Sequence, residues 1–237
     1  MKYFNITALQ ATISRIREGN ITHEHRTGSA ALGLTRHYFP VDSFVITPEQ
    51  IQEFTRKKPD LAIEKFISSS STFIPHCFVE VKSIINSSIN NIPDQLFATM
   101  RVTIDDFGFI NDNFSTFMIA MKGTKIAFYV YHSFSSLLDD YNIFNYKGFI
   151  PLNYVIPEEN FLVYHKDYVL NYQAYEYYKI GLNFETDADK LRDLGVESTQ
   201  RIPHPHIFDL LNEKHYDHIH NMFKYFAKEN PNRIFRS

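Results

Sequence analysis

Apolar residues recur at helical spacing near the start of the chain. Ile6, Leu9, Ile13 and Ile16 fall on one face of a helix predicted over residues 5–18. A second helix is predicted over residues 23–37, although it contains two glycines, and Pro40 ends it. The chain therefore opens with two amphipathic helices.

The next part of the chain changes to short apolar runs of strand length. A short strand is predicted over residues 41–46, and Thr47-Pro48 then resembles the N-cap and first turn of a helix that reaches about Arg56. Pro59 returns the chain to extended structure. Two strands follow, the first starting at Pro59-Asp60 and the second ending at Lys82, with a serine-rich loop between them.

Later patterns complete an α/β arrangement. A helix is predicted over residues 92–104, and a hairpin over residues 116–121 and 125–132 with Lys122-Gly123-Thr124 as its connection. Residues 134–180 predict mixed short elements, residues 186–194 a short helix, and residues 208–229 one or two closing helices. We expect one domain over residues 1–237, with a core over residues 1–135 and a C-terminal elaboration of unknown role over residues 136–237.

Composition narrows the class of protein. With 44% apolar and 16% aromatic residues, the 237-residue chain can bury a substantial core. The formal charge of −3 argues against a wholly basic nucleic-acid binder, but an acidic metal site lowers net charge, so a nuclease is not excluded. Cys77 is the only cysteine, which excludes an internal disulfide, and its place in a strand favours a buried core thiol.

The apolar runs are all shorter than a membrane span. The N-terminal residues lack the apolar stretch of a signal peptide, and no run approaches the roughly 20 residues that cross a bilayer. We therefore expect a soluble intracellular protein, cytoplasmic or nuclear, that does not bind membranes.

Candidate chemistry lies at the two ends of the predicted strand pair. Residues two apart on a strand share a face, so Glu80 and Lys82 project together while Val79 and Val81 face a core. If the two strands pair, Asp60 comes beside Glu80. Two carboxylates with an ammonium group suit a divalent metal held by oxygen ligands.

Pro59-Asp60, a strand and then Glu80-Val81-Lys82 resemble the PD-(D/E)xK nuclease superfamily. The resemblance covers about residues 20–132 and implies a restriction-endonuclease-like αβββαβ core, in which a central mixed β-sheet is flanked by helices. It implies that Asp60 and Glu80 ligate Mg²⁺ or Mn²⁺, that Lys82 orients or activates water, and that Gln95 supports the site. The implied activity is hydrolysis of DNA or RNA phosphodiester bonds.

Less specific interpretations compete with this one. A Glu-x-Lys pair on a strand is commonly solvent-facing, and Pro-Asp commonly begins a turn. The alternatives are a catalytically inactive nuclease-fold module that binds nucleic acid or a protein partner, and an unrelated α/β interaction protein with an accidental motif. The C-terminal hundred residues leave substrate recognition and a homodimer interface both open.

Other polar residues have two interpretations each. Glu24, with Glu18 behind it, is the candidate for a third metal-binding carboxylate, but the helix dipole alone also favours a carboxylate there. His23 and His25 flank Glu24, and a histidine ligand here would resemble viral cap-snatching endonucleases of the same superfamily. A cluster of later histidines suggests zinc, but without a second cysteine structural roles are favoured; its members are His204, His206, His215, His218 and His220.

Overall fold

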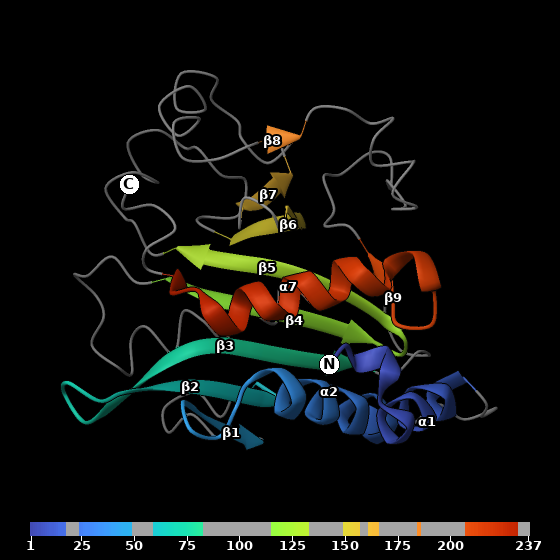
Figure 1. Ribbon diagram of the computed structural model, residues 1–237, viewed down its shortest axis with the longest axis horizontal. Coiled ribbons are helices and arrows are strands. Elements are labelled where there is room, and N and C mark those ends of the chain that lie inside the picture. Colours follow the sequence, from blue (N-terminus) through green and yellow to red (C-terminus); the bar gives the residue numbers. More distant parts are fainter. Residues whose placement is uncertain are drawn as a thin grey trace.

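The computed structural model describes residues 1–17, 24–48, 59–82, 115–132, 149–156, 161–165, 184–185 and 207–231, which form an α/β fold with a mixed sheet (Figure 1). Its helices are η1 (Tyr3–Asn5), α1 (Thr7–Arg17), α2 (Glu24–Tyr38), η5 (Glu213–His215) and α7 (Tyr216–Lys228). Its strands are β1 (Phe44–Pro48), β2 (Leu61–Ile67), β3 (Thr72–Lys82), β4 (Ser115–Lys122), β5 (Lys125–His132), β6 (Phe149–Ile156), β7 (Phe161–His165), β8 (Phe184–Glu185) and β9 (Phe208–Asp209).

The strands lie in chain order across the sheet, from β1 to β8, and β9 pairs with β5. β1, β2 and β3 form an antiparallel meander, β4 lies parallel to β3, and β5 is antiparallel to β4. Parallel neighbours cannot be joined by a tight turn, and the residues between β3 and β4 in the chain, 83–114, lie outside the described ones. The predicted hairpins β2–β3 and β4–β5 are confirmed.

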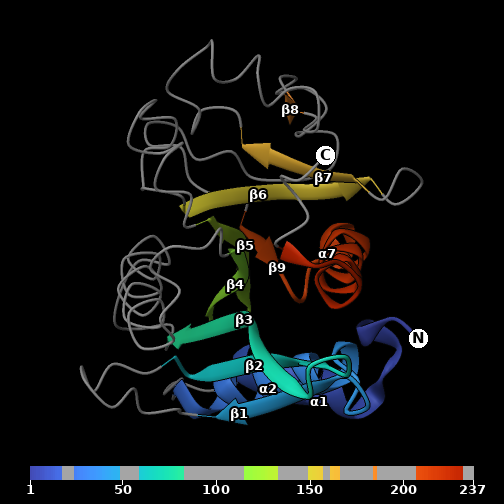
Figure 2. The same cartoon turned by 90° about the vertical axis from the view of Figure 1, so that its left-hand side faces the viewer.

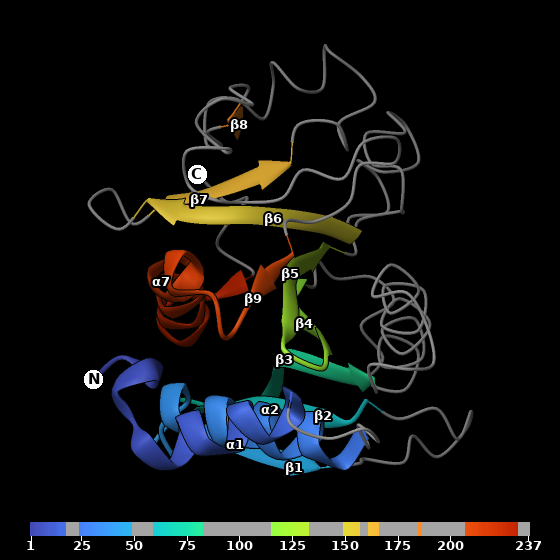
Figure 3. The same cartoon turned by 90° about the vertical axis from the view of Figure 1, so that its right-hand side faces the viewer.

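One face of the sheet is covered by α1, α2 and α7, which lie on the same side of it in two opposite views, each perpendicular to Figure 1 (Figures 2 and 3). Alternate residues of the central strands join these helices in one hydrophobic cluster, including Cys77, Val79, Val81, Phe117, Ile119, Met121, Ile126, Phe128 and Val130. Val79 and Val81 therefore face the core as predicted, and Cys77 is the predicted buried thiol, with a pKa that burial raises well above its usual value. The apolar period of two along each strand thus defines the core face.

The C-terminal helix is anchored to β3 and β4 by one stacked pair and one hydrogen bond. Phe226 stacks on Phe117 with ring centroids 4.0 Å apart, and the Phe226 carbonyl oxygen accepts a hydrogen bond from His76 Nε2 at 2.6 Å. His76 has no register partner on β2, because a bulge separates the pairs Ile63↔Cys77 and Glu64↔Pro75. Burial lowers the pKa of His76 to about 4, so the ring is neutral at pH 7 and donates to a single carbonyl.

Two predicted helix starts are wrong. Thr47 and Pro48 end β1 and pair with Ala62 and Leu61 rather than beginning a helix. Proline fits here because β1 has only one strand neighbour among the described residues, so its missing N–H costs little. Residues 208–209 form β9, so the closing helix begins only at Tyr216.

The first two predicted helices are confirmed as α1 and α2, with ends one to two residues from the expected ones. The helices predicted over residues 92–104 and 186–194, and the continuation of the Thr47 helix over 49–56, lie outside the described residues. Across the part of the chain that the structure describes, no helix is both long and apolar enough to cross a membrane.

The two glycines of α2 give a matched test of how closely α1 and α2 pack. A Cβ at Gly28 would meet no described atom within 4 Å, whereas a Cβ at Gly33 would lie 2.8 Å from Leu9 Cδ1. We expect Gly28→Ala to raise the free energy of unfolding by about 0.5–1 kcal/mol through helix propensity. Gly33→Ala should raise the free energy of unfolding by less, because the Leu9 side chain must move to make room for the new Cβ. Urea unfolding followed by circular dichroism measures both, and an equal gain in the two variants would contradict the close approach of the helices.

Candidate active site

The candidate site forms where β2 begins and β3 ends. Leu61 pairs with Val79, so Asp60, one residue before β2, lies beside the last residues of β3. Its Oδ2 accepts a hydrogen bond of 2.6 Å from the backbone N–H of Val81. The antiparallel register of one hairpin therefore brings the two halves of the sequence motif together, as the sequence predicts.

Glu80 and Lys82 share the sheet face opposite the helices. Lys82 Nζ donates to Glu80 Oε1 at 2.6 Å, and the Glu80 side chain is only 8% exposed. This burial excludes the interpretation of Glu-x-Lys as a solvent-facing charge pair. A buried carboxylate must be paired, and Lys82 is its partner.

Glu24 completes the group from a different element. It is the first residue of α2, half exposed, and its Oε1 lies 4.0 Å from Lys82 Nζ. Its place at a helix N-terminus would favour a carboxylate without any site. Its position beside Lys82 shows that the start of α2 and the end of β3 converge on the same ammonium group.

The charges of the site perturb one another. The pKa of Glu80 is raised to about 6, first by burial and then by the negative charge of Asp60, with Glu24 adding to the effect, while the hydrogen bond and charge of Lys82 oppose it. The pKa of Lys82 is lowered by burial, but Glu80, Asp60 and Glu24 together outweigh burial and raise it. Lys82 is therefore a protonated cation at neutral pH, and three carboxylates compete for it.

The oxygen donors fit a hard divalent cation through Asp60 and Glu80. Among the described residues, no group of three His, Cys, Asp or Glu side chains lies close enough to hold a metal. Mg²⁺ is commonly bound by one or two carboxylates together with waters and substrate phosphates, so a pair of carboxylates suffices. A cation would also relieve the repulsion that raises the pKa of Glu80. Glu24 as a third ligand stays a prediction.

The remaining predicted site residues divide into two groups. Gln95, Glu18 and His23 lie outside the described residues, as do His204 and His206. The other histidines of the cluster lie apart from the candidate site. His220 Nδ1 contacts the Tyr38 hydroxyl at 2.7 Å, and the His218 ring stacks on Phe208.

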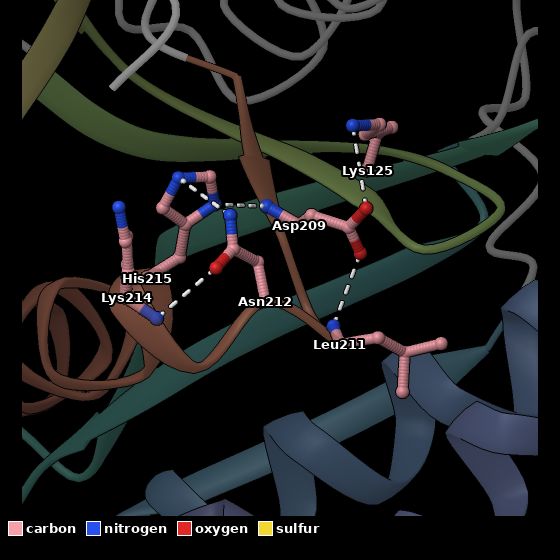
Figure 4. Close-up of polar contacts among 6 residues, drawn as sticks. All are labelled: Lys125, Asp209, Leu211, Asn212, Lys214 and His215. Atoms are coloured by element: carbon pink, nitrogen blue, oxygen red, sulfur yellow. Dashed lines mark hydrogen bonds and ion pairs between the residues drawn. The ribbon is translucent and has the colours of Figure 1, made fainter. Parts of the chain in front are cut away.

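His215 closes the turn after β9 (Figure 4). Its Nδ1 accepts a hydrogen bond of 2.8 Å from the backbone N–H of Asp209, and its other ring nitrogen lies 3.3 Å from Asn212 Nδ2. Asp209 in turn accepts from the Leu211 N–H and forms an ion pair with Lys125. These contacts give His215 a structural role, which supports the structural interpretation over zinc.

Lys122 is a residue that sequence reasoning placed in a turn and therefore missed. It is the last residue of β4 and lies in register with Lys82 on β3. The signal that would have found it is the parallel pairing of β3 with β4, which aligns the carboxyl ends of the two strands.

A comparison of the chain with protein-family models, with curated proteins and with solved structures finds no match. What the site can do is therefore inferred from its geometry and charge.

The raised pKa of Glu80 predicts a pH-dependent stability. Because its folded pKa of about 6 exceeds the ordinary 4.5, the stability that Glu80 contributes is complete below pH 4.5 and is lost as pH rises through 6. Relative to wild type, Glu80→Gln should gain about 2 kcal/mol of unfolding free energy between pH 4.5 and 7. Urea titrations at each pH measure the difference. A difference that stays flat across this pH range would contradict the electrostatic argument.

Proposed function

We propose that this chain is a metal-dependent nuclease of the PD-(D/E)xK type that hydrolyses DNA or RNA phosphodiester bonds. The observation that carries the proposal is the convergence of Asp60, Glu80 and Lys82 at the end of β3. The Asp60 carboxylate accepts a hydrogen bond from the Val81 backbone N–H, and Lys82 Nζ donates one to Glu80. Residues separated by a whole hairpin thus meet in the combination that phosphodiester hydrolysis requires, namely hard oxygen ligands and a neighbouring cation.

The order of the elements supports the αβββαβ core. α2 precedes the meander β1–β2–β3, and β4 then follows parallel to β3 after residues 83–114. The helix expected between β3 and β4, which would carry Gln95, falls within those residues and stays part of the proposal.

Asp60 and Glu80 would hold Mg²⁺ or Mn²⁺ at this site. The bound ion would offset charge on the phosphate and lower the pKa of a coordinated water. Asp60 is held in position by the hydrogen bond from the Val81 N–H. On β3, Glu80 is held by burial and by its hydrogen bond with Lys82. Both ligands are therefore positioned by the sheet before any cation arrives.

Lys82 orients water or stabilises charge on the phosphate rather than acting as a base. Its raised pKa keeps the proton on Nζ, so it donates hydrogen bonds and does not accept a proton at neutral pH. Its ammonium group lies within reach of two carboxylates, Glu80 at 2.6 Å and Glu24 at 4.0 Å. Glu24 at the half-exposed rim can hold Lys82 toward an incoming substrate.

One observation favours the inactive module as a second candidate. The Lys82–Glu80 ion pair satisfies the buried carboxylate without any metal. A buried carboxylate that is already paired in this way can persist as a structural remnant in a protein that only binds nucleic acid or a protein partner. Metal binding separates the two candidates.

Cleavage of single- and double-stranded DNA and RNA in Mn²⁺ or Mg²⁺ tests the activity. We expect at least one substrate to be cleaved, with loss of cleavage in EDTA. Asp60→Asn and Lys82→Ala should each lower the rate by about 10²-fold or more, because each removes a group that stabilises the transition state. Equal activity in wild type and both variants would indicate a contaminating nuclease.

Calorimetric titration with Mn²⁺ provides a readout that does not depend on turnover. Wild type should bind Mn²⁺, and Asp60→Asn and Glu80→Gln should each weaken binding, since each removes one charged oxygen ligand. Folding of each variant is checked by circular dichroism. If wild type binds no Mn²⁺ yet binds nucleic acid, the inactive module is the correct function.

A further inference from the structure

Three lysines form a row across the sheet beside the candidate site. Lys82 on β3 is in register with Lys122 on β4, and Lys122 is in register with Lys125 on β5. Their chain neighbours Val81, Met121 and Ile126 all belong to the hydrophobic core, so the three lysines lie on the opposite face. Like charges on adjacent strands repel one another, and such a row is destabilising unless each cation has a counter-charge.

The two outer lysines have that counter-charge. Lys82 contacts Glu80 and Glu24. Lys125 forms an ion pair of 3.3 Å with Asp209, which β9 brings alongside β5 (Figure 4). Within the part of the chain that the structure describes, no carboxylate forms an ion pair with the middle lysine, Lys122, although it is only partly exposed between two other cations.

The backbone holds Lys122 in this position. Gly123 follows it with φ of 58°, a left-handed conformation that glycine adopts without strain, and its N–H donates to the Lys82 carbonyl oxygen at 3.3 Å. The β4–β5 turn is therefore tied to the end of β3. Neighbouring strands lie about 4.8 Å apart, so ammonium groups from positions 82 and 122 can reach the same phosphate group.

We propose that Lys122 binds a backbone phosphate of the nucleic-acid substrate, next to Lys82. This inference rests on the proposed function and adds a substrate-positioning residue to it. The substrate phosphate would then supply the counter-charge that no described carboxylate gives to Lys122. A lysine ammonium is a compact, movable point charge of the kind that contacts phosphate without reading sequence. The contact adds affinity for any sequence and makes binding depend on salt.

The test measures binding of a fluorescein-labelled oligonucleotide by anisotropy at several KCl concentrations. It uses the full chain in EDTA, so that neither metal nor cleavage contributes. Lys122→Ala should weaken binding about fivefold to tenfold and reduce the slope of log K against log[KCl] by about one. Lys122→Arg should restore most of the affinity. Lys224→Ala, which removes an exposed lysine on α7, should change neither quantity.

Further outcomes separate this inference from the proposed function. If wild type cleaves and Lys122→Ala changes neither the affinity, the salt slope nor KM, the phosphate contact is wrong and the nuclease stands. If wild type does not cleave but Lys122→Ala weakens binding as expected, the phosphate site stands and the protein is the inactive module. Lower unfolding free energy of Lys122→Ala with unchanged oligonucleotide binding would show a structural role and overturn the inference, as would a wild type that binds no oligonucleotide.

Discussion

The side-chain alternation of β3 is the constraint on which both the core and the candidate site depend. Val79 and Val81 pack in the hydrophobic cluster. Glu80 and Lys82, which alternate with them along β3, point to the opposite face of the sheet. A shift of one residue in register would bury the charges against the helices and expose the valines. The packing that stabilises the fold therefore also specifies the geometry of the site, and the two cannot vary independently.

Electrostatic strain is concentrated at the carboxyl ends of β3 and β4. Burial and neighbouring carboxylates disfavour the charged form of Glu80, and the in-register lysines Lys82 and Lys122 repel each other. A fold selected only for stability would place neutral side chains at these positions. Functional sites characteristically contain charged groups that destabilise the fold when no ligand is bound. A cation would offset the charge of Glu80, and a phosphate would offset that of the lysines.

The sequence predicted those elements whose formation depends on the pattern of neighbouring residues. The amphipathic helices, the β2–β3 hairpin and the buried Cys77 follow from periodicity. Thr47-Pro48 carries a genuine helix-start pattern, yet pairing with Leu61 and Ala62 overrides it. Lys122 could not be placed beside Lys82, because Lys82 lies 40 positions earlier and the two meet only through a parallel pairing that no local pattern encodes.

If the motif were accidental, Asp60, Glu80 and Lys82 would have no reason to converge. A Glu-x-Lys pair that occurred on a strand by chance would be expected to face solvent. A Pro-Asp pair that occurred by chance would be expected only to begin a turn. Here Glu80 is buried, and the Asp60 carboxylate accepts a hydrogen bond from the backbone N–H of the adjacent residue, Val81. Burying an acid beside a second acid is unfavourable unless something compensates, and one lysine is shared among three carboxylates. A divalent cation bound by Asp60 and Glu80, as proposed above, would offset the carboxylate charge that the shared lysine does not.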